Sequence, residues 1–169
     1  VGVEIHSMSK GFHMIGWRLG WVCGHERIVR AFSDVKDNSD SGQFIAIQKA
    51  AAAALDDDNI PRQVRAKYER RLKKLVETLT RSGFTCKMPG GTYFLYANSP
   101  KGLAGGPAFE NAEACSQFLI NEHSIITVPW DDAGAFLRFS VTYEAADEKL
   151  EDALMAETEK RLKQLKPVF

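Results

Sequence analysis

The pattern of apolar and polar positions predicts two short strands followed by two helices at the start of the chain. Residues 3–6 resemble the end of a buried strand, and the apolar run at residues 21–23 is typical of another strand. Apolar residues then recur at helical spacing in residues 26–36 and, after a polar turn cluster at residues 37–42, in the alanine-rich residues 43–55. The sequence therefore predicts a strand, a loop, a second strand and two helices.

A third, longer helix is predicted from residue 61 to 82, because proline is favoured in a first helical turn and Gly83 is a typical terminator. Its apolar stripe consists of Val64, Tyr68, Leu72, Leu75, Val76 and Leu79. The basic side chains of this helix lie mostly off that stripe, namely Arg62, Arg65, Lys67, Arg70, Arg71, Lys73 and Lys74. They indicate a solvated helix face rather than a nucleic-acid site.

The second half of the chain alternates short strands with helices. Strands are predicted at residues 84–87, 92–96, 125–128 and 135–141, and helices at residues 112–122 and 145–165. In the last strand Phe136, Arg138 and Ser140 alternate with Leu137, Phe139 and Val141, so the two sets face opposite sides. Thr142 is the expected cap of the final helix, whose predicted stripe is Leu150, Leu154, Thr158, Leu162 and Leu165. This order predicts a small α/β domain with a largely antiparallel sheet.

The acidic break at residues 56–59 predicts a domain boundary, which divides the chain into residues 1–58 and 59–169. Basic and acidic residues number 22 each, so the net charge of zero gives no attraction to nucleic acid or to an anionic membrane. The longest apolar run, at residues 50–55, is too short to span a bilayer. We therefore expect no nucleic-acid and no membrane partner.

The three cysteines, Cys23, Cys86 and Cys115, are widely spaced in apolar surroundings. This usage predicts reduced, buried thiols of a cytoplasmic protein rather than a disulfide framework. No cysteine or histidine pair has the spacing of a metal-binding motif, so no metal site is predicted.

The loop between the first two strands contains the candidate functional residues. It reads Ser7-Met8-Ser9-Lys10, and further on Gly16-Trp17-Arg18-Leu19-Gly20. A lysine amine can bond covalently to an aldehyde cofactor, while a serine hydroxyl and an arginine fork can bind that cofactor's phosphate. The two glycines allow the backbone to bend and to approach other groups closely.

This ordered string resembles the lysine motif of the class I/II aminotransferases of fold type I, which depend on pyridoxal 5'-phosphate. The resemblance implies that Lys10 is the catalytic lysine that binds the cofactor, that Ser7 and Arg18 bind its phosphate, and that Ser9 assists them. It also implies the α/β fold of the PLP-dependent transferases. Residues 1–58 are then the C-terminal remnant of the large cofactor-binding domain, and residues 59–169 are the small domain.

Family members carry half of the large domain ahead of the lysine. We therefore expect this chain to be a C-terminal fragment that is inactive by itself, because groups that pair with and stack on the cofactor lie upstream in the family.

Arg138 is the second charged residue of interest. A charge in the middle of a strand, between aromatic neighbours, is costly unless it is paired or reaches solvent. The residues alone leave open an outward-facing side chain or a structural ion pair. The resemblance implies instead that Arg138 binds the substrate α-carboxylate through a two-pronged contact. It also places Trp130 in a variable loop over the substrate.

The resemblance implies a small-molecule amino acid and a 2-oxo acid such as 2-oxoglutarate as substrates, a cytoplasmic location, and a homodimer. Residues 35–48 are similar to LL-diaminopimelate aminotransferase-like members, in which Asn38, Asp40 and Ser41 would reach the neighbouring subunit's site. Alanine-, aspartate- and other class I/II enzymes share much of this pattern, so the amino donor stays open. Two alternatives remain open. Fold-type-I lyases use the same lysine for β-elimination or carbon–sulfur cleavage, and some regulators contain the fold as a non-catalytic domain.

Overall fold

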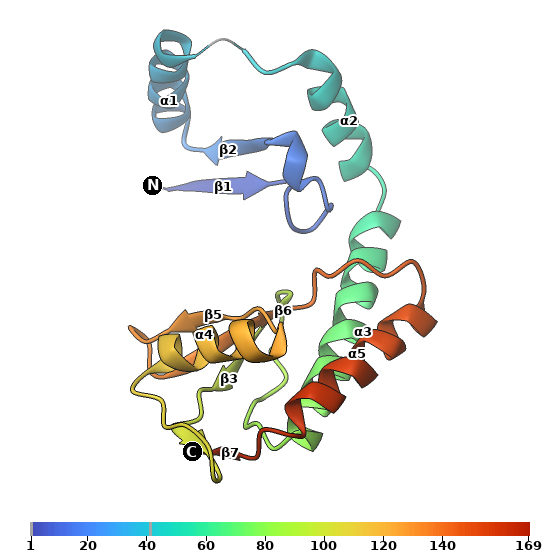
Figure 1. Cartoon of the computed structure of the whole chain (residues 1–169). Coiled ribbons are helices and arrows are strands. Elements are labelled where there is room, and N and C mark those ends of the chain that lie inside the picture. Colours follow the sequence, from blue (N-terminus) through green and yellow to red (C-terminus); the bar gives the residue numbers. More distant parts are fainter. Residues whose placement is uncertain (1, 41) are drawn as a thin grey trace. The chain divides into compact units, whose positions relative to one another are not determined.

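The computed structural model describes residues 2–40 and 42–169 of the chain (Figure 1). The chain forms two compact units, Val1–Ala66 and Lys67–Phe169, which are described separately below. The division falls inside the long helix α3 (Asn59–Arg81). The predicted domain boundary between residues 58 and 59 stays a prediction.

The first unit contains an antiparallel hairpin of β1 (Val3–Ser7) and β2 (Gly20–Gly24), followed by α1 (Glu26–Ser39) and α2 (Ile45–Leu55). A short 3-10 turn, η1 (Ile15–Trp17), lies in the loop of the hairpin. The predicted strands and helices of this part are confirmed, but the expected burial of the first strand is wrong, since β1 is exposed along its whole length.

Helix α1 continues three residues beyond its predicted end. The side chains of Asn38 and Ser39 donate hydrogen bonds to carbonyl oxygens one turn earlier, both at 2.7 Å. Lys36 also pairs with Asp40 across the last turn, at 2.6 Å. These local bonds extend the helix into residues 37–39, which the sequence predicted as a turn.

The second unit is built on a three-stranded antiparallel sheet in the order β3 (Phe94–Asn98), β6 (Phe136–Ser140), β5 (Val128–Trp130). Helices α4 (Ala112–His123) and α5 (Glu148–Leu162) and the later part of α3 complete it, together with a small ribbon of β4 (Gly102–Leu103) and β7 (Pro167–Val168). The predicted α/β architecture with an antiparallel sheet is confirmed.

The two faces of this sheet differ sharply. Alternate residues of β3 and β6 are buried, namely Leu95, Ala97, Leu137 and Phe139. The opposite face carries Tyr96, Trp130 and Arg138, which are exposed or half-buried. The predicted alternation in residues 136–141 is therefore confirmed, and Arg138 lies on the open face. Leucines of α3 and α4, among them Leu72, Leu75, Leu79 and Leu119, are also buried; burial of each such side chain contributes about 2 kcal/mol.

Several predicted strands of this unit were misplaced. Residues 84–87 form only an isolated bridge, Cys86 to Ala97, so the predicted strand there is wrong. Strand β3 begins at Phe94 rather than at residue 92, because Thr92 has a φ of 77°, which an extended strand cannot adopt. Strands β4 and β7 were missed, since two-residue strands that pair across a long sequence separation leave no local pattern.

The last helix is also shorter and rotated compared with its prediction. Asp147, not Thr142, caps α5, and its side chain accepts a hydrogen bond from the Leu150 amide at 2.8 Å. The helix buries Glu151 and Met155, whereas Leu150 is 51% exposed. The predicted apolar stripe is therefore wrong at Leu150 and Leu154, where the buried carboxylate decides which face turns inward, and it is confirmed at Leu162 and Leu165, which are buried.

Glu151 is the centre of a buried ion cluster. Its carboxylate accepts hydrogen bonds from Arg71 Nε at 2.7 Å, Arg70 Nη2 at 3.0 Å and Lys74 Nζ at 3.2 Å. Arg71, which the sequence placed on a solvated face, is only 2% exposed and also donates to the carbonyl oxygens of Val141 and Tyr143. The hydrogen bonds from Arg70 above all, and those from Arg71 and Lys74, lower the pKa of Glu151 to about 2.

Truncation of this carboxylate should destabilise the second unit strongly. Glu151→Ala leaves the buried Arg71 guanidinium without its counter-charge, so we expect the free energy of unfolding to fall by about 3 kcal/mol. Urea denaturation followed by far-UV circular dichroism measures this change. Glu157→Ala, which removes a solvent-exposed ion pair with Arg161, is the matched control and should have little effect. Equal effects of the two substitutions would contradict a structural role for the cluster.

The same cluster predicts a dependence of stability on pH. The pKa of Glu151 lies below its ordinary value of 4.5, so its contribution is complete above pH 4.5 and is lost as the pH falls toward about 2. The difference in unfolding free energy between the wild-type chain and Glu151→Gln should therefore shrink across that interval. Denaturation series at several pH values measure it, and a difference that stays constant would show that Glu151 is not charged and paired in the folded state.

Candidate functional site

The loop that joins β1 to β2 is anchored by a buried methionine. The side chain of Met8 is fully buried, its amide donates to the Leu19 carbonyl at 3.1 Å, and its own carbonyl accepts from the Met14 amide at 3.2 Å. These bonds close the loop directly beyond the hairpin. Ser7 and Lys10, on either side of this anchor, are exposed, and Ser9 is 8% exposed.

Gly20, at the end of the motif, is required for a steric reason. A Cβ atom at Gly20 would lie 2.5 Å from the carbonyl oxygen of His6, which is closer than any side chain tolerates. Gly20 is paired with Ser7 in the hairpin, so only glycine allows β2 to approach β1 where the loop begins. Gly16, by contrast, has open space around it.

The hydroxyl and guanidinium groups of the motif are oriented by local bonds. The Ser7 hydroxyl oxygen accepts from the Ser9 amide at 3.1 Å, which turns the chain before Lys10. Arg18 has a left-handed backbone, with a φ of 52°, and its Nη1 donates to the Ile15 carbonyl at 3.1 Å. This conformation folds the Arg18 side chain back over the 3-10 turn of its own loop.

The structure thus brings Ser7, the last residue of β1, together with Ser9, Lys10 and Arg18 of the loop that follows it in the first unit. Hydroxyl and guanidinium groups are the usual protein donors to a phosphate, and an exposed amine can react with an aldehyde. This donor set fits an aldehyde cofactor that carries a phosphate. The roles of the four residues remain predictions.

Arg138 lies in the second unit, at the centre of the open sheet face. It stands on the middle strand, directly opposite Tyr96 of β3 and Val128 of β5. Its guanidinium carbon lies 4.4 Å from the ring centroid of Phe94 and 5.4 Å from that of Trp130. Among the described residues, no carboxylate lies within ion-pair distance of Arg138. The alternative of a structural ion pair therefore has no support in residues 2–40 and 42–169.

Sequence reasoning missed the neighbours of Arg138. Trp130 was expected in a variable loop, but it is the last residue of β5, and Phe94 was given no role. Strand pairing identifies these neighbours. Phe94 is two residues from Tyr96, and Trp130 is two residues from Val128, the direct partners of Arg138, so both aromatic side chains lie on the same sheet face as Arg138.

The residues expected to reach a neighbouring subunit lie around the end of α1. Asn38 donates to the carbonyl oxygen of Asp34, and Asp40 pairs with Lys36. Ser41 lies outside the described residues.

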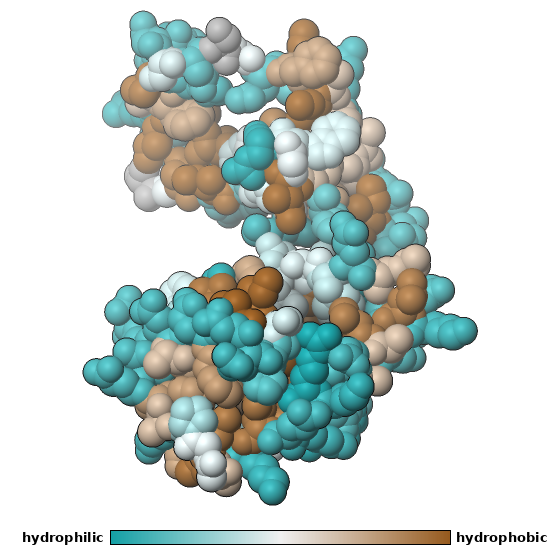
Figure 2. All heavy atoms as spheres, in the orientation of Figure 1, coloured by the Kyte–Doolittle hydropathy of each residue, from teal (hydrophilic) through white to brown (hydrophobic). Residues whose placement is uncertain are grey.

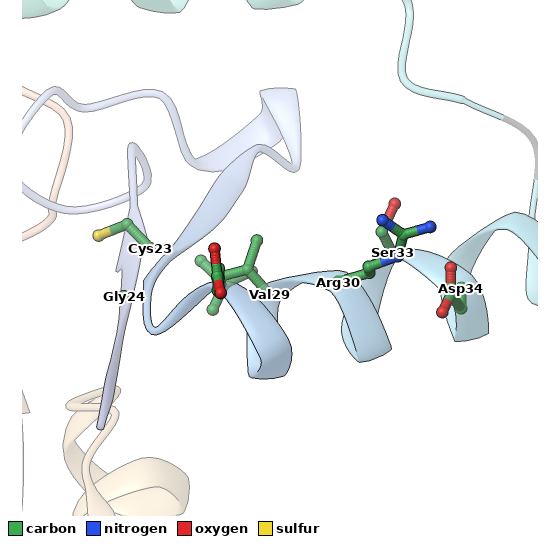
Figure 3. A pocket seen from close by; sticks show the side chains of 8 residues that line it. Cys23, Gly24, Val29, Arg30, Ser33 and Asp34 are labelled. Atoms are coloured by element: carbon green, nitrogen blue, oxygen red, sulfur yellow. The ribbon is translucent and has the colours of Figure 1, made fainter. Parts of the chain in front are cut away.

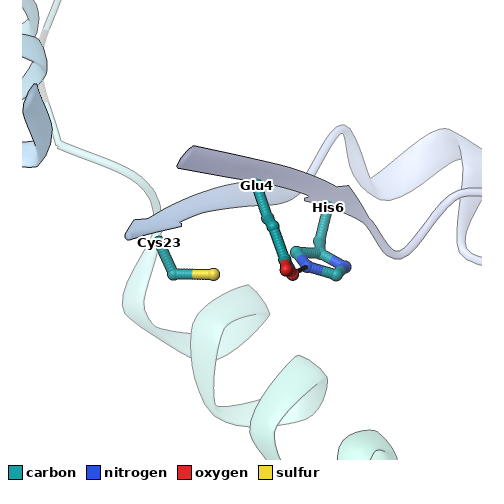
Figure 4. A group of neighbouring side chains, drawn as sticks. All are labelled: Glu4, His6 and Cys23. Atoms are coloured by element: carbon teal, nitrogen blue, oxygen red, sulfur yellow. Dashed lines mark hydrogen bonds and ion pairs between the residues drawn. The ribbon is translucent and has the colours of Figure 1, made fainter. Parts of the chain in front are cut away.

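The hairpin also brings together Glu4, His6 and Cys23, whose ligand atoms all lie within 4.8 Å of one another (Figure 4). Glu4 and Cys23 are register partners, and His6 Nε2 bonds to Glu4 at 2.8 Å. A divalent metal could use such groups, but one imidazole nitrogen already bonds to the carboxylate. The prediction that the protein has no metal site stays a prediction.

The three cysteines differ from their predicted burial. Cys23 is exposed, so the prediction that it is a core residue is wrong, whereas Cys115 is buried as predicted and Cys86 is half-buried. All three are free thiols. Burial raises the pKa of the Cys115 thiol to about 11, so this group stays protonated and unreactive at neutral pH.

Among the described residues of the first unit, a pair of open hollows can be distinguished that contain no predicted site residue. One is lined by β2 and α1, including Cys23, Val29, Arg30 and Asp34 (Figure 3). The other lies between the loop, at His13 to Trp17, and Phe44 and Ile47.

In the part of the chain that the structure describes, no helix combines the length and the apolar character needed to cross a membrane.

Curated relatives match the whole length of the chain. It is 52% identical to the LL-diaminopimelate aminotransferase of Methanococcus maripaludis over 174 residues, a match that covers 100% of this chain and 42% of the relative. The enzyme of the same name from Methanocaldococcus jannaschii is also 52% identical, over 96% of this chain and 40% of the relative. The chain therefore spans about two fifths of the length of these relatives.

Solved aminotransferases have the same fold. An aminotransferase from Staphylococcus aureus matches 98% of this chain with a TM-score of 0.79 and 24% identity. The aspartate aminotransferase from Rhizobium meliloti matches 96% of the chain with a TM-score of 0.80 and 20% identity. In each case the matched part is about two fifths of the solved chain, 43% and 41% respectively.

The family comparison covers both units of the structure, since the model of the family "Aminotransferase class I and II" matches residues 2–156. With the lysine loop in one unit and the antiparallel sheet in the other, this chain belongs to the class I and II aminotransferase family.

Proposed function

We propose that the protein containing this chain is an aminotransferase that depends on pyridoxal 5'-phosphate and moves an amino group between an amino acid and a 2-oxo acid such as 2-oxoglutarate. The observation that carries the proposal is the loop of residues 7–18, in which an exposed lysine is accompanied by two hydroxyl groups and an arginine. Membership of the aminotransferase family supports it.

Different residues of the loop would bind different groups of the cofactor. Arg18 and Ser7, with the help of Ser9, would hold the phosphate, and Lys10 would bond to the aldehyde carbon. When bound, the cofactor supplies an electron sink for the negative charge that develops at the substrate Cα atom. Lys10 Nζ lies on the same loop as these groups and would act as the general base that takes the proton from the substrate Cα atom.

Arg138 would bind the α-carboxylate of the substrate. Its guanidinium lies half-buried on the open sheet face and has no carboxylate partner among the described residues. A planar fork fixes a carboxylate in orientation as well as in position, which is how the Cα–H bond would be directed toward the base.

The preferred amino donor that we propose is LL-diaminopimelate, because two relatives with 52% identity carry the name LL-diaminopimelate aminotransferase. We further propose a cytoplasmic homodimer, with Asn38, Asp40 and Ser41 near the neighbouring subunit's site.

The surface of the first unit supports the view that the isolated chain is inactive and that further polypeptide covers it. Large apolar side chains are exposed there, and brown atoms mark such surface in Figure 2. Ile5 is 83% exposed, Phe44 is 71% exposed and Val35 is 66% exposed, although β1 and α1 each carry apolar residues typical of a buried element. Apolar surface of this kind on a folded unit is usually covered by another surface.

The role of Lys10 is tested by its removal from the full-length protein. Lys10→Ala should abolish the visible absorbance of the lysine-bound cofactor and the covalent adduct that borohydride reduction leaves on this residue. Lys49→Ala, which changes another exposed lysine of the first unit, should keep both signals. Absorbance spectra and mass spectrometry of the reduced protein measure them. If the Lys10→Ala protein keeps a reducible cofactor bond, the proposed function is wrong.

The role of Arg138 is tested by the pattern of kinetic constants. Arg138→Lys keeps the charge and loses the planar fork, so KM should rise about tenfold for every amino donor alike, because one charge-assisted hydrogen bond contributes about 1.5 kcal/mol or more. Arg81→Lys, which changes an exposed arginine that pairs with Glu159, should leave KM unchanged.

The assay uses 2-oxoglutarate and a panel of donors that includes LL-diaminopimelate. An unchanged KM for Arg138→Lys would contradict the carboxylate site. Absence of transfer from every donor in the wild-type protein would favour a lyase or a regulator instead.

A further inference from the structure

We propose that Phe94 and Trp130 are positioning residues that hold the Arg138 guanidinium between their rings and keep its N–H edges free for the substrate carboxylate. The inference deepens the proposed function, and it rests on the role proposed there for Arg138. It concerns only the second unit and depends on strand register, ring distances and the surroundings of one side chain.

The register of the sheet places the three side chains in a diagonal row. Arg138 is on the central strand β6, and its direct partners are Tyr96 on β3 and Val128 on β5. Phe94 and Trp130 are each two residues from those partners, so they share the face of Arg138 and flank it from the two outer strands. Long and aromatic side chains at such diagonal positions are within reach of one another.

The distances show that both rings contact the guanidinium. Its carbon lies over the Phe94 ring, 4.4 Å from the centroid, and over the Trp130 ring, 5.4 Å from the centroid. Both values are within the range of an attractive cation–π contact. Two such contacts from opposite neighbouring strands restrict the rotamers of a long side chain that solvent would otherwise leave mobile.

The chemistry of the flanking groups decides what remains for a ligand. An aspartate or glutamate would also orient Arg138, but it would occupy the N–H donors that a substrate carboxylate needs. An aromatic ring interacts with the flat face of the guanidinium and leaves the donors at its edge unused. Arg138 has two aromatic rings beside it and no acidic partner among the described residues. Both features leave its N–H donors available for a substrate carboxylate.

A second layer of aromatic contacts steadies Trp130. The ring of Tyr96 stands edge-on to Trp130, with centroids 5.9 Å apart and an interplanar angle of 87°. The same Tyr96 ring stands edge-on to Phe136, at 6.0 Å and 84°. Such edge-to-face pairs are favourable beyond simple burial, so the ring next to Arg138 is itself held in place.

The test uses Phe94→Leu and Trp130→Leu in the full-length protein loaded with the cofactor. Each substitution should raise KM for amino donors about fivefold, while kcat changes less than about twofold, because a loosened guanidinium binds carboxylate less well. The dissociation constant of glutarate, measured by calorimetry, should rise by a similar factor. Glutarate has the two carboxylates of 2-oxoglutarate but no oxo group, so its binding is measured without the reaction.

Two further variants separate positioning from a general packing effect. Trp130→Phe keeps a ring face and should restore most of the affinity for glutarate. Phe109→Leu removes a half-buried aromatic residue that pairs with Phe118, 5.3 Å away, and does not contact an arginine, so it should leave both constants unchanged. Thermal unfolding of every variant shows whether the sheet remains folded.

The outcomes distinguish this inference from the function on which it rests. If Arg138→Lys leaves KM and glutarate binding unchanged, the carboxylate role of Arg138 is wrong. If Arg138→Lys weakens both, but Phe94→Leu and Trp130→Leu behave like Phe109→Leu, the positioning role alone is wrong. If Trp130→Leu has no further effect in a protein that already carries Arg138→Lys, the two side chains act as one unit, and this supports the inference. Additive losses would contradict it.

Discussion

The buried pair of Arg71 and Glu151 is the interaction on which the second unit depends. Two opposite charges, each only 2% exposed, lie 2.7 Å apart and connect α3 to α5. Arg71 also donates to the carbonyl oxygens of Val141 and Tyr143, in the segment that follows β6. One guanidinium therefore fixes two helices and the chain just beyond the strand that carries Arg138. Because a buried charge without a partner is so costly, the cluster allows few other arrangements of these elements.

The two arginines of this unit show how environment sets the role of a side chain. Arg71 donates hydrogen bonds to a carboxylate and to backbone carbonyls, and its side chain is buried. Arg138 lies on the open face of the sheet, where its described neighbours are rings rather than acids. The first guanidinium is thereby satisfied by the fold, while the second keeps hydrogen-bonding capacity for a ligand.

The lysine loop of the first unit depends on a different kind of constraint, which is almost entirely local. Met8 closes the loop through two backbone bonds, Gly20 permits the close approach of the strands, and Ser7 turns the chain before Lys10. All of these groups lie within a short stretch of sequence. This is why a motif of a few residues is enough to identify the loop and the family to which the chain belongs.

The sequence by itself determined the features that local interactions control. These are the first two strands, all five helices to within three residues at each end, the alternation in β6, and the grouping of Ser7, Ser9, Lys10 and Arg18 around one loop. The pairing of strands and the burial of charged side chains could not be predicted from local sequence. The sequence placed Arg71 in solvent and a leucine stripe inside α5, whereas the tertiary structure buries Arg71 with Glu151 and exposes Leu150.

The same limit applies to the neighbours of Arg138 and to the ribbon of β4 and β7. Phe94 and Trp130 meet Arg138 only because β3 and β5 pair with β6 in one particular register, and β4 pairs with a strand at the far end of the chain. The alternation of apolar and polar residues indicates which face of a strand is buried, because it involves only residues adjacent in sequence. It does not indicate which distant strand pairs with that strand, because register is decided by the packing of the whole unit.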